Sequence, residues 1–369
     1  MAGRTLVQER AEKRERTLRR MVRDGSLNDV LDATETLWRD GESPARIRLR
    51  AAYTRNARKP DVELDERRRP PVEAMPRFAQ LLVSQGVAMQ FHLTALFAAQ
   101  CTTAPGRYWR NTIPLDRRQD DAEVTWLELV ASPAGSGRDR DYVSGHTANK
   151  LRQFRAALAT LSRKGLVGLG QSVRGRRYDG FELLTEGRRN TRAGASRYKV
   201  PLASEACLPV PREFFTRGWV HVLTKSETAA YLMWLHQGAA TTYVTVGWET
   251  RAGLYGLGQD VYDTHQALAA FGLLEVERPE GRRDNGTWRG YGRGSTPRRH
   301  RVRAVPDALA QDPLRIVPAA LRKCAALGTW SRPLDRSHPL ARSGSLDQPP
   351  SFDRTSSFDR SVNEDTPTG

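Results

Sequence analysis

The chain has 369 residues, enough for two or three domains, and 38% of them are hydrophobic and 27% charged, as is ordinary for a soluble globular protein. No apolar run approaches the roughly 18 to 20 residues that cross a bilayer, and the N-terminal stretch MAGRTLVQERAEKRERTLRR holds no apolar signal-peptide core. We therefore expect a cytoplasmic protein without a membrane partner. The three cysteines lie far apart and form no CxxC pair, which argues against a disulfide framework or a zinc ribbon.

The charge balance is strongly basic. The formal net charge is +17, with 59 Lys and Arg against 42 Asp and Glu. Such an excess usually indicates a polyanionic partner. A GC-rich genome would also enrich arginine, but without regard to its place in the chain. The arginines are dense in two glycine-rich segments, which favours a functional interpretation and association with the nucleoid.

Residues 1–74 are expected to form a charged, partly helical N-terminal extension and linker. Apolar residues at helical spacing predict one amphipathic helix in SLNDVLDATETLWRDG. The extension fits either a solvated arm that packs little or an arm that contacts DNA. KPDVELDERRRPP is interpreted as the linker, because it has charges and prolines but no periodicity.

Residues 75–200 are expected to form the first domain. QFHLTALFAAQC predicts its first helix, YWRNTIPL a strand, AEVTWLELVA a second helix and TANKLRQFRAALATLSRKG a third. A short strand, the arginine-rich loop QSVRGRRYDG and the strand-like GFELLTE follow. Residues 201–223 are expected to be a linker.

Residues 224–310 are expected to form the second domain. LTKSETAAYLMWLHQGA predicts a helix that begins with a Thr224-x-x-Glu227 capping box. The strand TTYVTV, the helices WETRAGLYG and GQDVYDTHQALAAFG, and two strands around an arginine-rich loop follow. Residues 311–328 predict a short helix. Residues 329–369 are rich in Ser, Pro, Asp and Arg and predict a disordered tail.

The two domains repeat one pattern. KGLVGL and FGLLEV align at an offset of 107 residues, and the same offset places Phe154 on Val261 and Leu161 on Leu268. Gly165 and Gly272 fall where a helix would end, because glycine adopts the left-handed C-cap conformation at little cost. We therefore expect a helix that leads into a two-stranded hairpin, twice.

This order of elements resembles the winged-helix family of helix-turn-helix proteins. YGLGQDVYDTHQALAAFGLLEV is similar to the turn, recognition helix and first wing strand of bacterial members, and the resemblance covers roughly residues 88–200 and 224–305. It implies a mainly α fold with small β-hairpins (α+β), with two tandem winged-helix domains and flexible N- and C-terminal extensions. Two such domains in a basic chain of this size also resemble theta-type plasmid replication initiators.

The third helix of the first domain is the first candidate DNA reader. Its predicted apolar stripe is Leu151, Phe154, Leu158 and Leu161. Helical spacing puts Asn149, Arg152, Gln153 and Ala156 on the opposite face, where Asn and Gln suit adenine, Arg suits guanine and Ala suits a thymine methyl. The flanking residues suit phosphates, as do arginines at the loop tip. The predicted DNA-binding residues of this domain are Asn149, Lys150, Arg152, Gln153, Arg155, Arg174, Arg176 and Arg177.

The corresponding helix of the second domain carries more acid. Its predicted outward face holds Gln259, Asp260, Asp263 and Ala267, and the two carboxylates would repel phosphates. The arginines of the following loop, the wing, offset these two carboxylates. This domain is therefore interpreted either as a binder of the phosphate backbone that uses its wing or as a dimerisation module. Its predicted DNA-binding residues are Gln259, Arg282, Arg283, Arg289, Arg293, Arg298 and Arg299.

No catalytic site, metal site or cofactor is predicted. The sequence has no GxxxxGK[ST] loop to bind a triphosphate and no His-x-His metal pair. His300 and Arg303 match an HxxR element of tyrosine recombinases, but no tyrosine follows Tyr291 to act as the nucleophile. We therefore expect a non-enzymatic protein.

These patterns predict a protein that binds double-stranded DNA in a sequence-dependent way. The first hypothesis is a plasmid-type replication initiator that recognises repeated origin sites, with a second copy of itself and host replication proteins as further partners. The second is a winged-helix transcriptional regulator that binds as a dimer. The third is an adaptor that uses the same domains for contacts with proteins rather than DNA.

Overall fold

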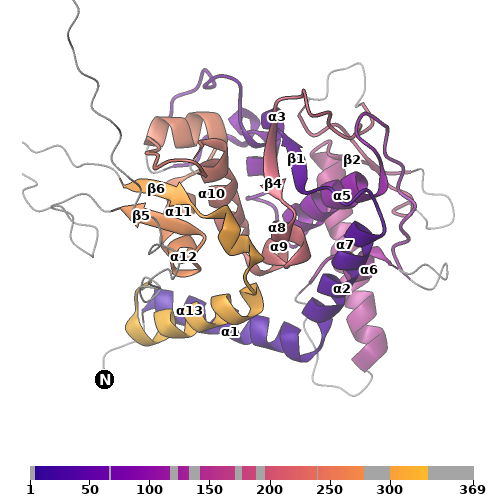
Figure 1. Ribbon diagram of the computed structural model, residues 1–369, viewed down its shortest axis with the longest axis horizontal. Coiled ribbons are helices and arrows are strands. Elements are labelled where there is room, and N and C mark those ends of the chain that lie inside the picture. The colour runs from indigo at the N-terminus through magenta and orange to yellow at the C-terminus, as the bar shows by residue number, and fades with distance from the viewer. Residues whose placement is uncertain are drawn as a thin grey trace, which may run out of the picture. The chain divides into compact units, whose positions relative to one another are not determined.

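The computed structural model describes residues 5–65, 68–116, 124–132, 142–170, 177–187, 196–238, 240–277 and 300–330. Within these ranges the chain is mainly α-helical and has three small antiparallel sheets, each of two strands (Figure 1). This agrees with the predicted α+β class. No helix in the described ranges is long and apolar enough to cross a membrane.

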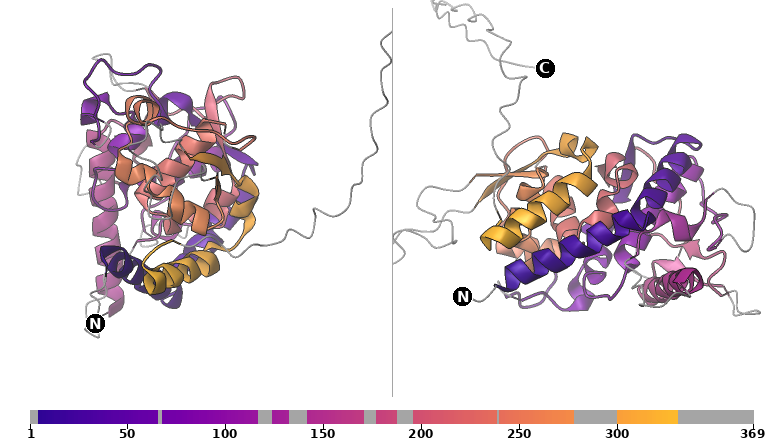
Figure 2. Two further views of the ribbon diagram at one scale, coloured as in Figure 1. Left: turned by 90° about the vertical axis from the view of Figure 1, so that its left-hand side faces the viewer. Right: turned by 90° about the horizontal axis from the view of Figure 1, so that it is seen from below.

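The N-terminal segment is part of the folded core. It forms α1 (Leu6–Arg23), α2 (Ser26–Arg39), β1 (Arg46–Arg50) and α3 (Ala51–Thr54). Helix α1 lies beside α13 (Pro313–Leu327), as Figures 1 and 2 show. This differs from the expected extension, because Ala11, Leu18 and Met21 form a buried face within the charged sequence of α1.

The segment 201–223, expected to be a linker, is also built into the core. It contains β4 (Cys207–Pro211), α8 (Glu213–Thr216) and α9 (Trp219–Val222). Strand β4 pairs with β1 in antiparallel register, and the Trp219 indole, fully buried, donates a hydrogen bond to the Leu309 carbonyl at 2.9 Å. Residues 1–333 accordingly form one compact unit rather than two domains joined by a linker.

The next elements are η1 (Val72–Ala74), α4 (Arg77–Gln80), α5 (Ala88–Thr102), α6 (Trp126–Leu129), α7 (Tyr142–Arg163), β2 (Val167–Gly168) and β3 (Glu182–Leu183). Helix α5 is buried on nearly all sides and lies at the centre of the core. The expected strand YWRNTIPL makes an isolated bridge between Tyr108 and Lys199. The expected helix AEVTWLELVA is shorter in its described part, where it forms α6 alone.

The last elements are α10 (Lys225–His236), a π-helical turn η3 (Thr250–Leu254), α11 (Gln259–Tyr262), α12 (His265–Ala270), β5 (Leu274–Glu277), β6 (Arg301–Ala304), η4 (Pro306–Ala310) and α13. The Thr224 capping box is present. The helix expected over GQDVYDTHQALAAFG is divided into α11 and α12. At the division the Thr264 hydroxyl donates to the Val261 carbonyl at 2.6 Å, a side-chain bond that competes with the regular backbone ladder.

The predicted repeat is visible in the hydrogen bonds. The Leu166 N–H donates to the Leu161 carbonyl at 2.9 Å, and the Leu273 N–H donates to the Leu268 carbonyl at the same distance. The glycine before each donor has a positive φ, 63° at Gly165 and 79° at Gly272. The chain therefore twice closes a helix with a left-handed glycine and enters an antiparallel hairpin.

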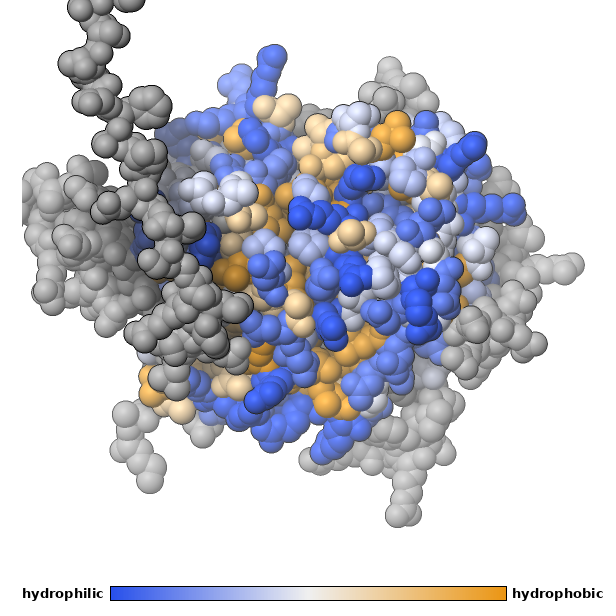
Figure 3. Space-filling model, viewed as in Figure 1, coloured by the Kyte–Doolittle hydropathy of each residue, from blue (hydrophilic) through white to orange (hydrophobic). Residues whose placement is uncertain are grey.

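One continuous hydrophobic core extends through both halves. Its aromatic centre lies under α7, where the Phe91 ring contacts the rings of Trp126, Phe154 and Phe181 with centroids 5.2 to 5.5 Å apart. Hydrophilic residues cover most of the visible described surface, and smaller hydrophobic areas lie between them (Figure 3). The contact of Phe154 with Phe91 thus fixes the buried side of α7 against the core.

Candidate nucleic-acid interface

Helix α7 is held on one side and open on the other. Phe154, Leu158 and Leu161 are buried at helical spacing, as the sequence predicts, and Leu151 of the same predicted stripe is half-buried. Phe154 packs edge-on against Phe91 of α5. In Figure 1 the helix runs along the edge of the folded unit. This anchoring leaves exposed residues on the opposite face of the helix between positions 148 and 163.

The open face carries cations between small side chains. Arg152, Arg155 and Ala156 are exposed, and Arg163 is exposed near the end of the helix. Asn149 is half-buried, and its Oδ1 accepts a hydrogen bond from the Arg152 guanidinium at 3.0 Å. The structure therefore brings together Asn149, Arg152 and Arg155 on one surface, as expected.

Two predicted residues of α7 lie elsewhere. Lys150 has an exposed fraction of only 8% and lies near Asp24, Asp29 and Glu128, and burial lowers the pKa of its ammonium group. It is therefore unable to flank the outward face as expected. The Gln153 amide is half-buried, and its Oε1 accepts a hydrogen bond from the Ser132 hydroxyl.

The hairpin after α7 is described in part. Strands β2 and β3 pair antiparallel, and Arg177 is exposed where the chain returns beside Gly170. The predicted residues Arg174 and Arg176 lie outside the described residues. Of the predicted arginines of this hairpin, Arg177 is the one that lies within the described part.

The corresponding surface of the second half is dominated by internal contacts. Gln259 accepts a hydrogen bond from the buried Arg251 at 2.6 Å and donates one to Asp263 at 2.7 Å. Asp260 forms an ion pair with Arg69. Ala267, expected to face outward, is 2% exposed, because α12 turns this side toward the core. Gln259, the first residue of α11, thus links Arg251 to Asp263 through its side-chain amide.

The described strands of the second hairpin, β5 and β6, pair their charges with each other. Arg301 pairs with Glu277 at 2.8 Å, and Arg303 pairs with Glu275 at 2.6 Å across β5 and β6. The Tyr243 hydroxyl donates to Glu275 at 2.6 Å, a bond that raises the pKa of Tyr243. The predicted Arg282, Arg283, Arg289, Arg293, Arg298 and Arg299 lie outside the described residues.

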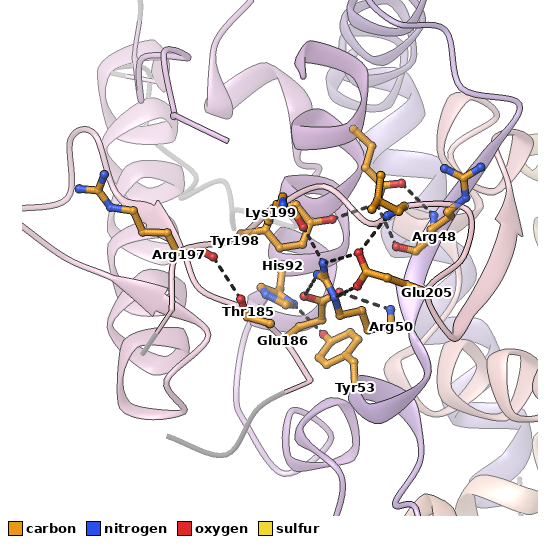
Figure 4. A network of polar contacts seen from close by, with 12 residues as sticks. Arg48, Arg50, Tyr53, His92, Thr185, Glu186, Arg197, Tyr198, Lys199 and Glu205 are labelled. Carbon is orange, nitrogen blue, oxygen red and sulfur yellow. Dashed lines mark hydrogen bonds and ion pairs between the residues drawn. The ribbon is translucent and has the colours of Figure 1, made fainter. Parts of the chain in front are cut away.

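Sequence reasoning missed a buried polar network behind the first hairpin (Figure 4). Arg50, at the end of β1, donates to the fully buried Glu186 at 2.9 Å and to Glu205 at 2.8 Å. Burial raises the pKa of Glu186, and the Arg50 charge opposes that rise. Gln100 of α5 donates to the Tyr198 hydroxyl at 3.1 Å.

This network joins four segments that lie far apart in the sequence. Buried charges need partners, and each member here has one. The sequence signal was the alternation in RIRLR, where arginines alternate with the buried Ile47 and Leu49. The network fixes the hairpin to β1, and no group of three or more His, Cys, Asp or Glu able to hold a metal ion occurs among the described residues.

Comparison with known proteins adds no family. The chain matches no protein-family model, no curated protein and no solved structure.

Proposed function

We propose that this protein binds double-stranded DNA with α7 in the major groove and the β2–β3 hairpin along the adjacent phosphate backbone. The observation that carries the proposal is the exposed cationic face of α7, held rigid by the aromatic core beneath it. The major groove admits an α-helix and presents a distinct donor and acceptor pattern for each base pair. A rigid, exposed helix with cations on one side has the shape and charge for that groove.

The residues of this face divide by chemistry. Arg152 presents a planar guanidinium that matches the two acceptors of guanine, and Asn149 matches adenine. The bond between them holds both side chains over the same stretch of helix. Ala156 presents a methyl group that leaves room for close approach to a thymine methyl. Arg155 and Arg163 extend the positive surface toward the phosphates.

The order of elements supports the same geometry. After α7 the chain turns at Gly165 into the β2–β3 hairpin, and in the second half Gly272 leads in the same way into the β5–β6 hairpin. A helix that leads into a two-stranded hairpin is the layout that the sequence resemblance implies. The second half, in which β5 and β6 pair their charges and α11 is acidic, suits support of the fold or self-association better than base reading.

For the biological role we propose a plasmid-type replication initiator that recognises repeated sites, acting without an enzymatic activity of its own. A dimeric transcriptional regulator would use the same α7 surface on inverted half-sites. The arrangement of bound sites decides between them: direct repeats at one locus support the initiator, and a near-palindrome at a promoter supports the regulator.

The test is selection of genomic fragments by the purified protein at about 150 mM salt, where nonspecific binding is weak. The wild type is compared with Arg152→Ala, which removes an exposed cation of α7. Arg315→Ala is the matched control, because Arg315 is exposed on α13, well separated from α7 in Figure 1. We expect selective recovery with the wild type and the control, and loss of selectivity with Arg152→Ala. Equal recovery of all fragments by all three proteins would refute the proposal.

A further inference from the structure

Two adjoining hollows form a groove beside the first hairpin and the C-terminal end of α7. The larger, of about 590 Å³, lies between α3, α4 and the end of α7. The smaller, of about 400 Å³, lies between β1, the turn after β3 and residues 196–205. Both hollows are lined by Ala52 and Gly187, so they meet there.

The groove is strongly basic. Its lining holds seven cationic side chains and two carboxylates, Glu73 and Glu205. Arg50 and Arg197 are paired with carboxylates, which offset their charge. Lys199 is exposed at the smaller hollow, and Arg163 is exposed at the larger one. The cations are Arg55, Arg77, Arg163 and Lys164 in the larger hollow and Arg50, Arg197 and Lys199 in the smaller.

An exposed aromatic ring stands in the smaller hollow. Tyr108 is 67% exposed, although its neighbour Trp109 is 6% exposed and donates to the Thr102 hydroxyl at 3.1 Å. The backbone of Tyr108 forms a β-bridge with Lys199. The Lys199 ammonium lies 5.9 Å from the centre of the Tyr108 ring. The backbone therefore fixes Tyr108 while its ring remains open to solvent.

We propose that this groove binds a single-stranded nucleic acid, with one base stacked on Tyr108 and the backbone following the cations toward Arg163. A positive groove combined with an exposed aromatic ring is the arrangement that recognises single strands without sequence preference. In a duplex the bases cover one another's faces, so Tyr108 can stack only on an unpaired base. The site goes beyond duplex recognition by α7, and of the side chains assigned to that recognition it shares Arg163 alone.

The test is fluorescence anisotropy of the full-length protein with a labelled oligothymidylate of roughly 20 nucleotides, longer than the usual site for one domain. Tyr108→Ala should weaken binding about 5- to 100-fold, the range expected for one stacked base. Tyr108→Phe keeps the ring and should bind within about twofold of wild type. Lys199→Ala should reduce the salt slope by about 0.7.

The outcomes separate this site from the duplex surface. Arg152→Ala should leave oligothymidylate binding unchanged, whether or not it alters duplex binding. If Tyr108→Ala binds as wild type, or if Arg152→Ala abolishes binding while Tyr108→Ala does not, the proposal is wrong. Thymidine monophosphate should compete weakly at equal nucleotide concentration, and competition equal to that of the oligonucleotide would overturn a strand site in favour of a mononucleotide pocket. Thermal unfolding of each variant confirms that the fold is intact.

Discussion

His92 should make the stability of the protein depend on pH. The imidazole is fully buried in the second turn of α5, and its Nδ1 lies 2.7 Å from the Tyr53 hydroxyl oxygen. Within the described residues its Nε2 has no hydrogen-bond partner. Burial, with a smaller contribution from the charge of Arg77, lowers the pKa of His92 to about 3 from 6.5. The folded protein therefore holds this histidine neutral.

The size of this pH effect on the free energy of unfolding follows from the difference in proton binding between the unfolded and the folded chain. Between the two pKa values, 6.5 in the unfolded chain and about 3 in the folded one, the unfolded chain binds more protons. Stability contributed by the neutral ring is complete above the unfolded value and is lost as the pH falls through that window. From about pH 7.5 to about pH 5.5 the loss amounts to about 1.4 kcal/mol.

The assay is urea unfolding, followed by tryptophan fluorescence, at about pH 7.5 and about pH 5.5. His92→Gln keeps an acceptor for the Tyr53 hydroxyl but cannot titrate. This variant should lose about 1.4 kcal/mol less than the wild type between the two pH values, whatever its stability at neutral pH. Tyr53→Phe is the control, because it removes the hydrogen bond and leaves the buried ring, so its pH dependence should match that of the wild type. An identical pH dependence in wild type and His92→Gln would refute the reasoning.

Three further predictions concern the interface and the core. Arg155→Ala should reduce the slope of duplex affinity against salt concentration by about 0.9, because one phosphate contact is lost; an unchanged slope would remove Arg155 from the interface. Lys150→Met should leave that slope unchanged, since Lys150 is buried beside acidic residues; a reduced slope would place its ammonium group on DNA after all. Trp219→Ala should lower the free energy of unfolding by about 3 to 5 kcal/mol, and circular dichroism and fluorescence should report one shared transition; two separated transitions would contradict the single core.

Local signals in the sequence predicted the local structure well. The apolar stripe of α7, the glycine that ends it and the hairpin that follows depend on residues within a few positions of one another. The same holds for the capping box at Thr224. Each of these features is set by helix geometry or backbone conformation, which a short stretch of sequence specifies.

Long-range pairing was not predictable in the same way. Strand β1 pairs with β4, from Arg46 with Pro211 to Arg50 with Cys207, although the two strands lie far apart in the chain. The alternation in RIRLR indicates a strand but does not identify its partner. For the same reason 1–74 and 201–223 were expected to be an extension and a linker, whereas both pack into the core.

In the candidate site, too, the sequence predicted what depends on local helix geometry and not what depends on contacts between distant segments. Periodicity placed Arg152 and Ala156 outward with Arg155 beside them, and all three are exposed. It also placed Lys150 at the margin, but the side of α7 that carries Lys150 meets acidic residues of other elements, and such neighbours lie outside a helical projection. Tyr108 gave no sequence signal, because its exposure depends on the burial of Trp109 and on the bridge to Lys199.

The central claim is that α7 enters the major groove of a duplex, and site-directed cross-linking tests it most directly. Ala156→Cys places a thiol on the exposed face of α7, and Ala326→Cys places one on the exposed side of α13 as the control. Each variant is mixed with a selected duplex that carries a disulfide-tethered base in its major groove, moved one position at a time along the site. The account predicts that Ala156→Cys cross-links at one or two positions within the footprint and that Ala326→Cys does not. Equal cross-linking of both variants, or none from Ala156→Cys at any position, would contradict it.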